Sequence, residues 1–238
     1  MSIFGTVAFA SLAAFSATPS VTMNTALGDL VVVGVQNKTG SIPATGVVTD
    51  TIGNTYTRLT ASFIKDGGAN QDGVIFFYCL SSIGANVLNI VQVSGQTSYV
   101  ALAVWDIPVS GGTVALDTST GLPATGNDAG TASENLLTGS FNTAGTDELV
   151  FAISCCSTVS ITYTQESGWT LDSSGILPYQ KAGAQHVHFS SAQAGITASM
   201  TLSASEFWAL AAAAFTGTAA GGGDGMNGSG LLRLLGVD

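Results

Sequence analysis

The chain has 238 residues, of which 46% are hydrophobic and only 8% are charged, and its formal net charge is −10. Its five lysines and arginines are scattered and too few to neutralise nucleic-acid phosphates or to hold an anionic membrane, so neither partner is expected. The length admits one large sandwich or two small domains, and the hydrophobic fraction is ample for a core.

Short apolar runs recur along the chain and are separated by Gly, Thr, Ser, Asn and Asp. This pattern predicts antiparallel strands joined by turns, at 4–16, 19–24, 29–36, 46–51, 55–64, 73–82, 86–94, 98–107, 113–117, 135–143, 147–155, 160–165, 169–172, 177–181, 185–190, 195–203 and 206–216. The polar stretch 118–133 is predicted to be a loop. The alanine-rich run 209–214 has helix propensity, but the aromatic residues on both sides of it favour a strand.

The first apolar segment, residues 3–17, has two interpretations. Its length suits a signal peptide, but no basic residue precedes it and Phe15-Ser16-Ala17 makes a poor cleavage site. Its bulky residues also alternate as they would in a strand. A first strand is favoured, and a cleaved leader remains the alternative.

Three runs are apolar at every position, at 30–33, 74–77 and 100–105. A strand with one wet face would alternate, so these strands are expected to lie in a sheet that is covered on both faces. Loops or a neighbouring subunit would supply the second cover. The neighbour is slightly favoured, which predicts a homo-oligomer, with a trimer as the favoured state.

The order of elements repeats weakly within the chain. Residues 28–35 resemble residues 147–154, and residues 98–103 resemble residues 206–211. The repeat fits two similar domains or one sandwich with matched halves, of about 1–120 and 121–218. One β-sandwich over 1–218 is favoured, because two sheets from matched halves would bury each other's inner faces.

Four motifs carry a resemblance to known proteins: Gly-Asp-Leu-Val-Val-Val at 28–33, Val-Thr-Asp-Thr-Ile-Gly-Asn-Thr-Tyr-Thr at 48–57, Ser-Gly-Trp-Thr-Leu at 167–171 and Trp-Ala-Leu-Ala-Ala-Ala-Ala-Phe at 208–215. Their order over residues 4–218 resembles jelly-roll modules of phage structural proteins and of bacterial surface proteins. The resemblance implies an all-β, jelly-roll-like antiparallel β-sandwich. These motifs mark a fold, and they bring no catalytic residues with them.

The C-terminal segment 219–238 differs in kind from the rest. Residues 219–230 have the glycine-rich composition of a flexible linker, and residues 231–237 are apolar. A free apolar heptad in water is a liability, so an extended arm that docks on a partner is expected, and a disordered tail is the alternative. The predicted partner-binding residues are Leu231, Leu232, Leu234, Leu235 and Val237.

Few residues suggest chemistry. Cys79, Cys155 and Cys156 are expected to be buried, with the adjacent pair facing opposite sides of a strand. His186 and His188 would share a strand face and offer two zinc ligands, but no third ligand is evident, so a polar face is favoured. Asp66, Asn70 and Asp72 lack the order of a calcium loop and are read as a solvated loop.

The carboxylates and aromatic rings also offer few candidates for a functional site. Asp147 and Glu148 are expected to face solvent on opposite sides of a strand start. Trp169, which follows Ser167-Gly168, is the candidate platform for a sugar ring. Trp105 and Trp208 lie inside apolar runs and are expected in the core, and Tyr56, Tyr163 and Tyr179 are further platform candidates.

The sequence therefore favours a non-enzymatic assembly protein that needs no cofactor. The expected role is a phage virion component, such as a capsid decoration, minor capsid or tail-associated protein, that binds copies of itself and other virion proteins. The alternative is a secreted or cell-surface module that binds carbohydrate.

Overall fold

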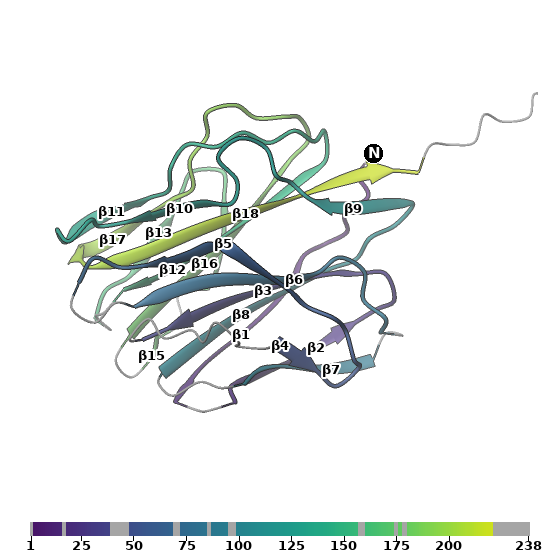
Figure 1. Cartoon of the computed structure of the whole chain (residues 1–238), viewed down its shortest axis with the longest axis horizontal. Helices are drawn as coiled ribbons and strands as arrows, with labels where there is room; N and C mark the ends of the chain where they lie inside the picture. Colours follow the sequence, from purple (N-terminus) through teal and green to yellow (C-terminus); the bar gives the residue numbers. More distant parts are fainter. Residues whose placement is uncertain are drawn as a thin grey trace, which may run out of the picture.

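The computed structural model describes residues 2–15, 18–38, 48–68, 72–84, 87–94, 99–156, 160–173, 176–177 and 180–220. Every regular element within these residues is a β-strand, and the strands pair antiparallel (Figure 1). The all-β, sandwich-like fold class is therefore confirmed. Each of the seventeen predicted strands overlaps an observed one.

The first half of the chain forms two sheets. Its strands are β1 (Ala8–Phe15), β2 (Ser20–Thr25), β3 (Leu30–Asn37), β4 (Val48–Asp50), β5 (Thr57–Lys65), β6 (Gly73–Cys79), β7 (Val87–Val93) and β8 (Tyr99–Ile107). The first large sheet has the order β1-β8-β3-β6-β5, and the first outer sheet has the order β2-β7-β4. Because β1 pairs with β8 along its whole length, the interpretation of the first apolar segment as a strand is confirmed.

The second half repeats this arrangement. Its strands are β9 (Gly112–Leu116), β10 (Ala124–Asn127), β11 (Ser133–Leu137), β12 (Glu148–Cys156), β13 (Tyr163–Gln165), β14 (Thr170–Ser173), β15 (Ile176–Leu177), β16 (Gln180–Phe189), β17 (Ser199–Glu206) and β18 (Trp208–Ala219). The second large sheet has the order β10-β18-β12-β16-β14, with β9 also on β18 and β15 on β16, and the second outer sheet has the order β11-β17-β13.

The two halves share one strand order. The central strand β3 corresponds to β12, its neighbours β8 and β6 correspond to β18 and β16, and β9 with β10 take the place of β1. In the outer sheets β2, β7 and β4 correspond to β11, β17 and β13. Eight strands in two sheets, with the first strand beside the last, is the jelly-roll pattern.

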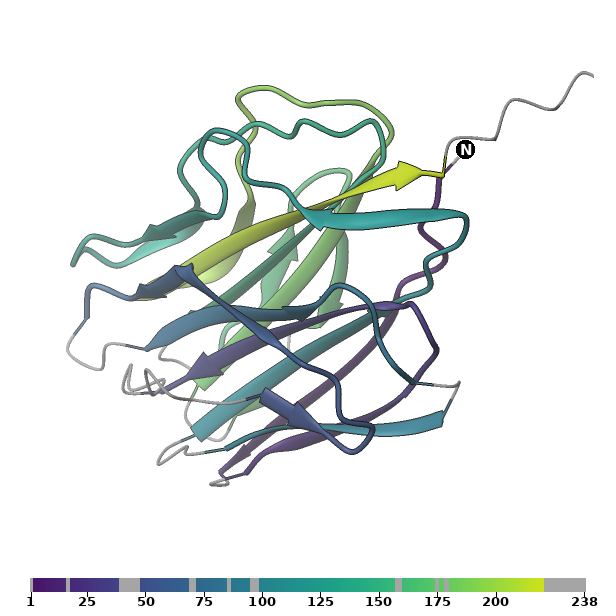
Figure 2. The ribbon, with the colours of Figure 1, turned by 45° about the vertical axis from the view of Figure 1, so that its right-hand side comes forward.

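The four sheets stack in layers, with one core in each of the three gaps (Figure 2). The two large sheets face each other across the central core, where the rings of Trp105 and Phe151 lie 5.1 Å apart. Each large sheet packs its other face on its own outer sheet. Gln36 ties the halves together by donating its side-chain N–H groups to the carbonyl oxygens of Ser154 (2.7 Å) and Gly183 (3.0 Å).

Strand alternation explains the runs that are apolar at every position. In β3, Leu30 and Val32 enter the central core, while Val31 and Val33 enter the core beneath the first outer sheet. The chain itself therefore covers both faces of these strands. The sequence favoured a neighbouring subunit as the second cover of these strands. That explanation is wrong, because the second cover is a sheet formed by distant segments of the same chain.

The expected loop at 118–133 needs a correction, because it contains β10. This strand pairs with residues 209–212 of β18. Only Ala124 among its four residues is apolar, so the segment shows no alternation that a sequence pattern would detect. By contrast, the alanine-rich run is confirmed as a strand, since it forms the middle of β18.

Candidate functional site

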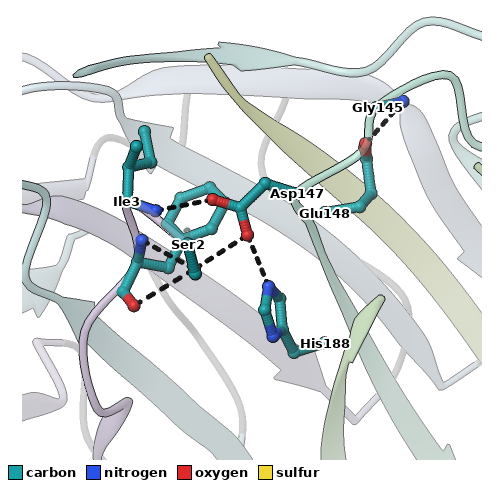
Figure 3. Close-up of polar contacts among 7 residues, drawn as sticks. Ser2, Ile3, Gly145, Asp147, Glu148 and His188 are labelled. Atoms are coloured by element: carbon teal, nitrogen blue, oxygen red, sulfur yellow. Dashed lines mark hydrogen bonds and ion pairs between the residues drawn. The ribbon is translucent and has the colours of Figure 1, made fainter. Parts of the chain in front are cut away.

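The end of the molecule where β18 stops gathers several polar side chains around Asp147 (Figure 3). Asp147 directly precedes β12, and its Oδ2 accepts a hydrogen bond from the backbone N–H of Ile3 at 2.7 Å. Its Oδ1 accepts one from the Ser2 hydroxyl at 2.8 Å and lies 2.6 Å from Nε2 of His188 on β16. Its backbone carbonyl accepts a bond from the N–H of Gly217.

Asp147 therefore holds together the N-terminal segment, β16 and the end of β18. Burial alone would raise the pKa of Asp147, but the hydrogen bonds from His188, the Ile3 N–H and the Ser2 hydroxyl outweigh it and lower this pKa below its usual value. Ser2 and His188 both bind Asp147 rather than each other. This geometry is not that of a serine nucleophile activated by a histidine base.

A cleft of about 390 Å³ opens beside this group. Hydroxyl groups and the imidazole of His188, whose side chain is 40% exposed, line much of it. The other lining residues are Ser2, Thr146, Asp147, Ser190, Gly217 and Ala219. Because Ser2 and Ala219 lie on the same cleft, the two ends of the described body lie together at this end of the molecule (Figure 1).

The charge on Asp147 should stabilise the fold at neutral pH. We expect Asp147→Asn to lower the free energy of unfolding by about 1–3 kcal/mol at about pH 7, because it weakens three hydrogen bonds to a carboxylate. A lowered carboxyl pKa contributes stability above the unfolded value of about 4 and loses it as the pH falls through the folded value, so the difference should shrink at about pH 3. Urea unfolding at both pH values measures it, with Ser190→Ala on the same cleft as the control. An equal loss at both pH values would contradict the role of the charge.

His186 makes a separate pair. Its Nδ1 lies 2.8 Å from Oδ2 of Asp172, and the same oxygen accepts a hydrogen bond from Nε1 of Trp105 in the other half, also at 2.8 Å. The two histidines thus each hold a different aspartate. Within the described ranges no group of three or more His, Cys, Asp or Glu side chains is placed to hold a metal ion.

Two further pairs of acids are buried, one in each half. Asp29 precedes β3 and faces Asp106 of β8, and Glu148 begins β12 and faces Asp117. Burial and the nearby second carboxyl raise the pKa of Asp106 to about 7 and that of Glu148 to about 8. Neither pair is predicted from the sequence. The internal repeat of the sequence contains a signal for them, because it aligns Asp29, next to the apolar residues of β3, with Glu148, next to those of β12.

The carboxylate expectations are partly corrected. Asp147 and Glu148 do point to different partners, as expected for adjacent strand residues, but both are buried rather than solvated. Asp66 and Asp72 are also buried, at 5% and 0% exposure, so the solvated-loop reading is wrong. The Asp66 N–H donates to the Asp72 carbonyl, and the next N–H, that of Gly67, donates to Oδ1 of Asp128. Asn70 lies outside the described residues.

Cys79, Cys155 and Cys156 are buried thiols, as expected. Cys155 lies in the central core and Cys156 in the core beneath the second outer sheet, so the adjacent pair does face opposite sides. Burial raises the pKa of the Cys79 and Cys155 thiols. Thiols of this kind are poor nucleophiles at neutral pH.

Trp169 is 8% exposed and packs in the core beneath the second outer sheet. It borders a cleft of about 200 Å³, whose other lining residues are Glu166, Ser167, Gly168, Val187, Phe189, Ile196 and Thr197. Trp105 and Trp208 lie in the core, as expected. Tyr163 is also buried, and Tyr56 donates its hydroxyl to Asp50. Tyr179 lies outside the described residues.

The predicted arm residues Leu231, Leu232, Leu234, Leu235 and Val237 also lie outside the described residues. The body ends where the Ala220 N–H donates to the Gly111 carbonyl at 2.7 Å. Among the described residues, no helix has the length and apolarity needed to cross a membrane. Comparison with protein-family models, with curated proteins and with solved structures finds no match to this chain.

Proposed function

We propose that this chain is a non-enzymatic assembly protein of a phage-type virion, either a capsid decoration or minor capsid protein or a tail-associated protein. The body, residues 2–220, is the displayed part. The arm, residues 221–238, attaches it to sister copies and to other virion proteins. The jelly-roll strand order supports this role only by analogy of fold.

The placement of the two ends of the body carries the proposal. Ser2 and Ala219 line one cleft, and Asp147 bonds both the N-terminal segment and Gly217. The arm therefore starts from a firmly held corner of the body.

The arm has the composition of an attachment device. Burial of four leucines and a valine contributes about 1.5–3 kcal/mol per side chain. Ordering a glycine-rich linker costs about 1–2 kcal/mol per residue. The sum of these two free-energy terms is favourable only when residues 231–237 bind in a preformed groove. Docking of the arm on a partner is therefore favoured over its ordering on an isolated chain.

Removal of residues 221–238 should leave the body folded and abolish self-association. We expect the full chain to form a homo-oligomer, most favourably a trimer, at tens of micromolar, and the truncated chain to be a monomer with an unchanged melting temperature. Leu232→Asp with Leu235→Asp should act like the deletion at full length. Light scattering and thermal unfolding measure both properties. If the truncated monomer has a melting temperature several degrees lower than the full chain, the arm belongs to the body's own core. If truncation leaves self-association unchanged, the attachment role is refuted.

The virion assignment has its own test. Particles purified on a density gradient from cells that carry this gene should contain the full-length chain. The alternative, a secreted or cell-surface module that binds carbohydrate, is favoured by the cleft beside Trp169, where aromatic and hydroxyl groups meet. Recovery of the chain from the medium or the cell surface instead of the particles would support that alternative.

A further inference from the structure

The first outer sheet exposes an apolar surface. Leu88 and Ile90 stand on the outward face of β7, at 65% and 37% exposure. Leu27 (72%) and Ile83 (60%) are exposed on the connections that follow β2 and precede β7, where the Gly28 N–H donates to the Ser82 carbonyl. We call these four residues the β7 face. They are four of the five large hydrophobic residues that the described chain exposes. Exposed apolar patches of this kind mark interaction surfaces.

The second half provides an internal comparison. Its strand β17 corresponds to β7 in the matched arrangement, and there the exposed positions carry small residues, Thr201, Ser203, Ala204 and Ser205. Both outer sheets bury their inner faces in the same way. The architecture therefore does not require leucine and isoleucine at these outward positions of β7.

We propose that the β7 face binds the apolar arm segment, residues 231–237, of a second copy of this chain. This inference rests on the proposed function, since it names the surface to which the attachment arm binds. The segment has seven residues, as does β7, so an extended arm matches the strand in length. Its four leucines and one valine match the apolar chemistry of the face.

The geometry favours a second copy over the same chain. The arm starts in the second large sheet, whereas the β7 face lies on the outside of the first outer sheet, two layers away (Figure 2). Packed sheets are about 10 Å apart, so the two points are separated by at least about 20 Å of protein. The ten linker residues 221–230 span at most about 33–36 Å, which leaves little slack for a path around the sheet edges.

The proposed contact joins two different surfaces, the arm of one copy and the β7 face of the next, so it is a head-to-tail contact. Contacts of this type close into rings when the rotation between copies allows it, which agrees with the favoured trimer. Each copy in such a ring gives one arm and receives one.

Self-association of full-length variants tests the proposal. We expect Leu88→Asp with Ile90→Asp to weaken association at least about 100-fold, as judged from the burial of two aliphatic side chains. The matched control is Thr201→Asp with Ser205→Asp at exposed positions of β17, which should associate like the parent chain. Both variants should keep the parent melting temperature, because the changed side chains are exposed. Sedimentation velocity over a concentration series measures the association.

A mixing experiment separates arm exchange from contact between two β7 faces. The β7-face variant keeps its arm, and the Leu232→Asp, Leu235→Asp variant keeps its β7 face. Each alone should be a monomer, and an equimolar mixture should form a complex. No complex in the mixture would overturn the proposal. If the arm variant is monomeric while the β7-face variant still associates, the attachment role stands and this docking surface is wrong. If the full chain never associates, both fail.

Discussion

The free energy of unfolding should fall as the pH rises from about 5 to about 9. The cause is the two buried acid pairs, Asp106 with Asp29 and Glu148 with Asp117. All four side chains are at most 5% exposed. Two carboxylates in contact cannot both ionise cheaply, so each pair is expected to share one proton. Such a proton also accounts for Asp106 Oδ1 and Glu148 Oε1, which are buried without a hydrogen-bond donor among the described residues.

The sign follows from the raised pKa values. The folded protein holds these protons up to about pH 7 for Asp106 and about pH 8 for Glu148, whereas the unfolded chain releases them near pH 4. Stability is therefore fully present below the unfolded pKa and is lost as the pH rises through the folded pKa. At about 1.36 kcal/mol per pH unit, over about two units for Asp106 and about three for Glu148, the combined loss between pH 5 and pH 9 is on the order of 7 kcal/mol.

Isosteric amides should remove this dependence. Asp106→Asn and Glu148→Gln imitate the protonated acids and keep a donor toward Asp29 and Asp117. We expect the double variant to be more stable than the parent at pH 9 and to show a much flatter profile. Glu134→Gln, at an exposed position, is the control and should keep the parent slope. Guanidinium unfolding across the pH series measures these differences.

Two results would count against the shared protons. A parent profile that is flat or that rises over this range would remove the effect itself. Recovery of stability at pH 9 on addition of calcium would show that the pairs bind a cation instead of a proton. The amide variants would then lose the response to calcium.

The strands were predictable because burial imposes a local period on the sequence. Residues 30–33 and 100–105 read as strands from composition alone, and their double burial was also evident. The source of the second cover was not predictable, because it depends on how four sheets stack. Strand β10 was not predicted for a related reason, since its position is fixed by pairing with β18 and not by a hydrophobic pattern in its own residues.

The polar groups were less predictable than the strands. His186 and His188 were seen to share a strand face, but their partners Asp172 and Asp147 come from other strands or strand ends. Asp66 and Asp72 looked solvated because glycines lie next to them in the sequence, yet both are buried, and the neighbouring Gly67 bonds to Asp128 of the other half. In each case the environment is set by contacts between distant segments, which no local pattern records.

Gly34→Ala should destabilise the fold by about 1–3 kcal/mol, the usual cost of overpacking a core. Gly34 lies on β3, where the two large sheets face each other. A Cβ added there would lie 2.6 Å from Cγ2 of Ile153 on β12 and 3.4 Å from the Trp105 ring. Gly139→Ala is the matched control, because its nearest neighbour would be the Thr125 carbonyl oxygen at 3.9 Å. It should change stability by no more than about 0.5 kcal/mol.

Ile153→Ala completes a double-mutant cycle across the central core. Alone it should cost about 2–5 kcal/mol, because it leaves a cavity. With Gly34→Ala the new methyl group occupies part of that space, so the combined loss should be smaller than the sum by about 0.5–3 kcal/mol. Urea unfolding followed by the fluorescence of the three buried tryptophans measures all three variants. Strictly additive losses would mean that Gly34 and Ile153 do not meet, and the face-to-face packing of the two halves at this point would be wrong.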